Sequence, residues 1–161
     1  MPRSKPDSKL KQQETMRLLA LAEDGQADAQ NALAARLATG YFVKPDQSGA
    51  LYWYAQAVRA GYTHAKWNAG TMLINGEGID SPERVLGMEL IEQAAKAGEM
   101  AACQLLSDCF EKGICGKPVD MALSQYWRGR ASSHSEFEEF GVGVELESLG
   151  IQLTKRRIEF Q

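Results

Sequence analysis

The most constraining feature of this sequence is a pattern that repeats with a period of about 36 residues. Two glycines mark each unit, and an alanine follows the first of them four residues later. The glycine pairs are Gly25 and Gly40, Gly61 and Gly76, and Gly98 and Gly113. A unit of this size cannot bury its apolar face alone, so successive units have to stack. The sequence therefore predicts a repeat architecture.

Each unit has the pattern of a helical hairpin. In the first unit Ala29, Leu33 and Leu37 recur at the spacing of one helical face, and Gly40 ends that helix. A second helix begins near a proline and runs through an aromatic or aliphatic pair. We match these pairs as Trp53-Tyr54, Leu90-Ile91 and Tyr126-Trp127. The predicted fold is an all-α, right-handed superhelix of about three helix-turn-helix repeats, at residues 23–59, 60–96 and 97–132.

These units resemble the Sel-one-like repeat family, which is related to the tetratricopeptide repeat. The middle unit carries Gly61, Ala65, Gly70 and Gly76-Glu77-Gly78-Ile79, and the first carries Ala50-Leu51-Tyr52-Trp53-Tyr54. The resemblance covers about residues 22–132. It implies an α-solenoid whose concave face binds proteins or peptides, and it implies no catalysis.

The segments outside the repeats suggest end caps. Residues 1–7 are expected to be disordered, and residues 8–22 to form an N-terminal capping helix with a polar outer side. Residues 133–161 form a C-terminal capping segment. Its periodicity fits a strand at Val142, Val144 and Leu146 and a helix at Phe137 and Phe140. A capping box at residues 135–138 favours a short helix there.

Composition narrows the function. With 18 basic and 21 acidic residues the formal charge is -3, which disfavours nucleic acid as the partner. No apolar run is long enough to span a membrane. The three cysteines are an odd number, which fits a reducing compartment. We expect a cytoplasmic protein of bacterial type.

Few residues could support catalysis or bind a metal. His64 and His134 have no partner at metal-ligand spacing, so both are interpreted as surface histidines. Cys103 and Cys109 have the spacing of buried thiols on one helix, whereas Cys115 lies in a loop and is either inert or exposed and reactive. The sequence predicts no enzyme activity, no metal and no cofactor.

The first helices of the three units offer the candidate binding face. Residues half a turn away from the predicted core positions line a concave groove. They are Asn31, Ala35, Trp67, Thr71, Gln104 and Asp108, and the neighbouring Asn68 is also near the groove. Trp67 is either an interface anchor or a packing residue between neighbouring helices. The amide side chains can hydrogen-bond an extended peptide backbone.

We therefore predict a non-enzymatic adaptor that binds a protein or peptide on its concave face. One alternative is an inhibitor or immunity protein that neutralises a toxin or enzyme by direct binding. Another is a hydrolase whose active site is not recognisable from the sequence. The glutamates at positions 136, 138, 139, 145 and 147 are either solvated or a docking patch for a basic partner. The sequence also allows a homodimer.

Overall fold

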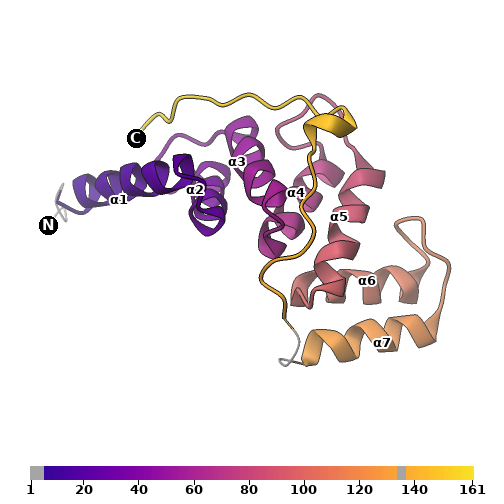
Figure 1. Cartoon of the computed structure of the whole chain (residues 1–161). Helices are drawn as coiled ribbons and strands as arrows, with labels where there is room; N and C mark the ends of the chain where they lie inside the picture. Colours follow the sequence, from indigo (N-terminus) through magenta and orange to yellow (C-terminus); the bar gives the residue numbers. More distant parts are fainter. Residues whose placement is uncertain (1–5, 134–136) are drawn as a thin grey trace, which may run out of the picture.

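The computed structural model describes residues 6–133 and 137–161 of the chain. These residues form α1 (Pro6–Glu23), α2 (Ala27–Thr39), α3 (Gln47–Arg59), α4 (Thr63–Asn75), α5 (Arg84–Lys96), α6 (Met100–Lys112), α7 (Met121–Ser132) and the short 3-10 helix η1 (Glu147–Leu149). After α1 the helices pair as α2 with α3, α4 with α5 and α6 with α7 (Figure 1). The predicted all-α solenoid of helix-turn-helix repeats is confirmed.

The three hairpins close in the same way. The first helix of each ends at a glycine in the left-handed conformation, with φ of 72° at Gly40, 74° at Gly76 and 65° at Gly113. The loop then folds back, and a backbone N–H donates to a carbonyl near the end of that helix. These bonds join Asp46 to Leu37 at 2.9 Å, Glu83 to Leu73 at 2.7 Å and Asp120 to Phe110 at 2.8 Å. Asp46, Glu83 and Asp120 are therefore equivalent positions.

This equivalence corrects the expected match between the first and third units. The side chains of Asp46 and Asp120 each cap their helix by accepting from the N–H three residues further on. Counting from these caps, Tyr126-Trp127 corresponds to Tyr52-Trp53, and both pairs pack edge to face with ring centroids 5.1 Å apart. The expected match to Trp53-Tyr54 is wrong by one residue, because aromatic identity marks a helical position less reliably than the cap does.

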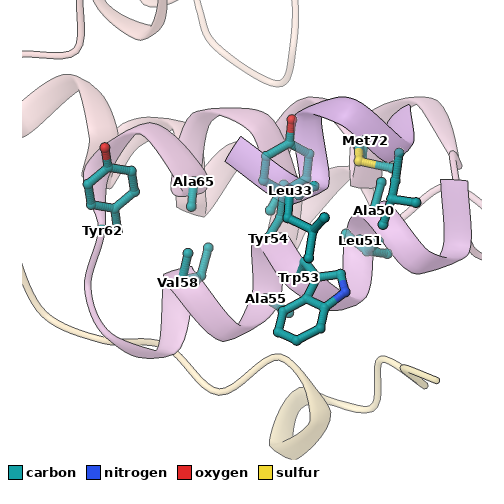
Figure 2. Packing of buried hydrophobic residues seen from close by; sticks show 14 of the residues in the cluster. Leu33, Ala50, Leu51, Trp53, Tyr54, Ala55, Val58, Tyr62, Ala65 and Met72 are labelled. Carbon is teal, nitrogen blue, oxygen red and sulfur yellow. The ribbon is translucent and has the colours of Figure 1, made fainter. Parts of the chain in front are cut away.

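The core consists of two clusters that small residues allow to pack closely. The larger cluster lies among α2, α3 and α4 and includes Leu33, Trp53 and Met72 (Figure 2). The smaller one joins α5 to α6. Where α4 meets α5, a Cβ on Gly70 would lie 2.8 Å from the carbonyl oxygen of Gly87, so this contact requires glycine.

Helix α1 packs against α2 through a buried polar contact. Thr15 is fully buried, and Arg36 donates to its hydroxyl oxygen at 2.6 Å. Leu18 is partly buried against the core, whereas Met16, which the sequence pattern also places on the core side, is 51% exposed. The expected disorder of residues 1–7 is wrong for residues 6 and 7, where α1 already begins, and residues 1–5 lie outside the described residues.

The C-terminal segment corrects the expectation of a short capping helix. From residue 137 to 161 it is extended apart from η1, and it runs back along the molecule from α7 to α1 (Figure 1). We call these residues the C-terminal strap. Leu146 and Ile151 anchor the strap in the larger core cluster, at 2% and 6% exposure. Residues 134–136, which hold part of the predicted capping box, lie outside the described residues.

Two glycines explain why the strap is extended. Gly141 donates its N–H to the carbonyl of Gly61 at 2.8 Å, so the two backbones touch. A Cβ on Gly143 would lie 2.0 Å from the carbonyl oxygen of Arg59. Glycine also disfavours a helix interior. The residues that interrupt the helical pattern are thus the ones that let the strap lie on the repeats.

No helix among the described residues has the length and apolar character needed to cross a membrane.

Candidate functional site

The predicted binding residues lie on the first helices of the three units. Asn31 and Ala35 belong to α2, Trp67, Asn68 and Thr71 to α4, and Gln104 and Asp108 to α6. Gln104 is exposed, and the other six are half-buried.

One hydrogen bond joins two neighbouring units on this face. Asn68 donates from Nδ2 to Oδ1 of Asn31 at 3.1 Å, so the amide groups of α2 and α4 lie side by side. The bond leaves the amide N–H groups of Asn31 and the oxygen of Asn68 without a partner in the described residues. This pair can offer both a donor and an acceptor to a ligand.

The other polar residues of this face form hydrogen bonds only within their own helices. Gln104 donates to Asp108 at 3.1 Å, one turn along the same helix. Thr71 donates to the backbone carbonyl of Asn68 at 2.8 Å. These bonds are local, so the inter-unit amide contact is confined to Asn31 and Asn68 among the predicted residues.

Trp67 packs against the smaller core cluster. The members of that cluster come from α5 and α6 and include Ile91, Ala95 and Leu106. The indole is nevertheless half-buried rather than enclosed. It therefore holds α4 against the next unit and still presents part of its surface to solvent.

His64 has a partner that the sequence did not suggest. Its Nδ1 lies 2.5 Å from Oε2 of Glu99, the residue that precedes α6. The repeat could have indicated this contact, because it stacks the start of α4 beside the start of α6. No group of three or more potential metal ligands occurs in the described parts of the chain. His134 lies outside them.

The three cysteines differ in burial, and the two on one helix are buried as their spacing predicts. Cys103 and Cys109 are buried, whereas Cys115 is exposed. Burial raises the pKa of the Cys103 thiol. It also raises the pKa of Cys109 to about 12, with a further contribution from the Cys115 thiol. Cys103 and Cys109 are therefore protonated, unreactive thiols at neutral pH.

A cavity lies elsewhere, between the strap and the loop that joins α4 to α5. It has a volume of about 580 Å³ and is lined by Ser48, Asp80, Ile151 and Arg156 among others. Ser48 donates to the carbonyl of Gly78, and Arg156 pairs with Asp46. Neither contact pairs a nucleophile with a base.

Solved structures share this fold. A Sel1 repeat protein from Oxalobacter formigenes is 25% identical, with a TM-score of 0.69 over 74% of this chain and 49% of that one. The protein c5321, a protective antigen present in uropathogenic Escherichia coli strains and displaying an SLR fold, is also 25% identical, with a TM-score of 0.65 over 73% of this chain and 25% of its own. This chain thus spans about half of the first structure and a quarter of the second. No curated protein matches it.

The family comparison matches the three hairpins directly. The model of the Sel1 repeat matches residues 27–62, 63–99 and 101–134, each of which begins with the first helix of a unit. Sel1 repeat proteins generally mediate protein–protein interactions and are typically non-enzymatic scaffolds. With its hairpins, their stacking and these three matches in agreement, the chain belongs to the Sel1 repeat family.

Proposed function

We propose that this protein is an adaptor that binds an extended segment of a partner protein across α2, α4 and α6. The observation that carries the proposal is the bond between Asn68 and Asn31, which aligns two amide groups across a unit boundary. An extended backbone offers N–H and C=O groups in pairs, which the remaining donor and acceptor of these amides complement.

The surrounding surface suits such a ligand. Ala35 leaves room for a chain to approach, and the half-buried Trp67 supplies apolar contact area beside the amides. Gln104 and Asp108 extend the polar row onto α6. Binding by main-chain hydrogen bonds and one aromatic anchor needs no catalytic group, in keeping with a scaffold.

The test is affinity capture from a lysate of cells that express the protein, comparing the wild type with Asn31→Ala/Asn68→Ala by mass spectrometry. The expected result is a partner whose recovery falls about tenfold in the double variant, because two hydrogen bonds to the partner's backbone are lost. Asn75→Ala is the matched control. Asn75 lies at the exposed end of α4 and bonds only to Glu77, two residues away. Equal recovery of all partners by the double variant would contradict the proposal.

A further inference from the structure

A group of aromatic rings lies where the described part of the strap begins. Tyr62 and His64 come from the start of α4, and Phe137 and Phe140 come from the strap. The ring centroids of Phe137 and His64 are 5.2 Å apart, and those of Phe140 and Tyr62 are 5.4 Å apart. The ring centroids of Tyr62 and His64 are 6.0 Å apart. We call these four residues the aromatic patch.

The two phenylalanines of the aromatic patch face solvent. Phe137 is 45% exposed and Phe140 is 51% exposed, although both rings contact α4. Hydrogen bonds fix the backbone that presents them. Thr63 donates its N–H to the carbonyl of Glu139 at 2.9 Å and its hydroxyl to the carbonyl of Glu138. Two large apolar side chains are thus held at the surface by an ordered backbone, which is typical of an interaction site.

Carboxylates surround the aromatic patch. Glu138 and Glu139 separate the two phenylalanines, and neither forms an ion pair with the described residues. Burial raises the pKa of Tyr62, and the negative charges of Glu139 and Asp28 raise it further. Glu99, which pairs with His64, is only 7% exposed and adds no carboxylate to the surface.

The helices account for this accumulation of negative charge. Asp28 lies in the first turn of α2, and Glu99 immediately precedes α6, so each is near the positive end of a helix dipole. Lys66 lies against Gly141 but is only 4% exposed. The surface itself therefore presents acidic groups around exposed rings.

We infer that the aromatic patch docks a protein segment in which Arg or Lys alternates with aliphatic residues. A cation binds over an aromatic ring, its aliphatic stem packs on the ring, and its charged group reaches a carboxylate. The same combination occurs elsewhere in this chain. Lys155 places Nζ 5.5 Å from the ring centre of Trp53 and pairs with Glu23 at 2.8 Å. Nucleic acid and anionic lipid would be repelled by the carboxylates.

This site is separate from the proposed amide site. It lies at the turn between α3 and α4, whereas Asn31 and Asn68 lie within α2 and α4. A variant of either site leaves the other intact, so the two proposals can fail independently.

The test uses a fluorescent nine-residue peptide of alternating arginine and leucine, followed by anisotropy at low ionic strength. We expect saturable binding by the wild type and about tenfold weaker binding by Phe137→Ser/Phe140→Ser, because two cation–π contacts are lost. Glu138→Gln/Glu139→Gln should weaken binding about fivefold and reduce its salt dependence. This second variant keeps the rings and the backbone, so it tests the proposal even if loss of the phenylalanines loosens the strap.

Two controls define the outcomes. Leu149→Ser removes another exposed apolar side chain of the strap, at 55% exposure, and should leave binding unchanged. A peptide with glutamate in place of arginine should not bind. Equal binding of both peptides, or arginine-peptide binding that neither double variant weakens, would overturn the inference. Light scattering tests whether a second copy of this chain occupies the patch. If the wild type self-associates and Glu138→Gln/Glu139→Gln does not, the occupant is a second copy, and the inference of a foreign segment is overturned.

Discussion

The second helices of the first and third units start alike but have different surroundings. Tyr52-Trp53 of α3 and Tyr126-Trp127 of α7 form edge-to-face pairs with the same 5.1 Å separation. Lys155 of the strap lies over the ring of Trp53 on α3, which is 3% exposed (Figure 2), whereas the equivalent Trp127 on α7 is half-buried. The tryptophan of the same local motif is therefore enclosed in one unit and partly exposed in the other.

The side of each helix that faces the next unit differs as well. On α3 it carries Leu51, Tyr54 and Val58, all of them buried, and the equivalent residues of α7 are Gln125, Arg128 and Ser132, all of them exposed. A solenoid has to end in a polar face to avoid wet apolar surface. The third unit provides that face itself, and the strap is free to cover the first unit.

The largest expected effect is a difference between two tryptophans. Trp53→Ala should lower the free energy of unfolding by about 4 kcal/mol, since it empties a buried site under the strap. Trp127→Ala should cost only about 1–2 kcal/mol, because this side chain is half-buried. Urea denaturation followed by circular dichroism measures both values. Equal losses would contradict the distinction between the two units.

A pair of leucines in the strap tests whether the strap is part of the core. Leu146→Ala should lower the free energy of unfolding by about 3 kcal/mol, because Leu146 is 2% exposed. Leu149→Ala, three residues further on and 55% exposed, should change it by less than about 0.5 kcal/mol. The same denaturation experiment applies. If Leu146→Ala were as mild as its control, the strap would not contribute to folding.

The polar end of α7 can be converted into the stacking face of α3. The triple variant Gln125→Leu/Arg128→Tyr/Ser132→Val gives α7 the residues that α3 buries at equivalent positions. It should associate as its concentration rises, with the scattering mass increasing about twofold over that of the wild type, because an apolar face becomes exposed. A mass equal to that of the wild type at every concentration would show that these residues do not end the stack.

The smallest effect concerns Gly129, for which Gly143 is the contrast. Gly129 of α7 has open space where a Cβ would lie, so Gly129→Ala should raise the free energy of unfolding by about 0.5–1 kcal/mol. Gly143→Ala should lower it instead, since its Cβ would collide with the backbone of Arg59. Thermal unfolding distinguishes the signs. Stabilisation by both substitutions would argue against the close contact of the strap with α3.

Local signals made most of the fold predictable. Gly40, Gly76 and Gly113 end helices because their left-handed conformation is a local property, and a periodic sequence displays it three times. The register of the second helices was predictable only from the caps at Asp46 and Asp120. The aromatic pairs suggested a match one residue away.

Long-range contacts were not predictable. The strap is extended because Gly141, Gly143 and Leu146 meet turns and core residues far away in the sequence, and its own periodicity fits a helix as well as a strand. The bond between Asn31 and Asn68 joins residues that the repeat places side by side, so their proximity could be predicted but not the hydrogen bond itself.

The central claim is that the partner binds across α2, α4 and α6 and not at the polar end of the solenoid. Photo-crosslinking tests it most directly, with p-benzoylphenylalanine replacing Thr71 of α4 in one variant and Gln125 of α7 in another. Both positions are at least partly exposed, so each can reach a bound partner, and neither replaces the Asn31 and Asn68 amides. The account predicts that a partner forms adducts from position 71 and none from position 125. Adducts from position 125 alone would contradict it.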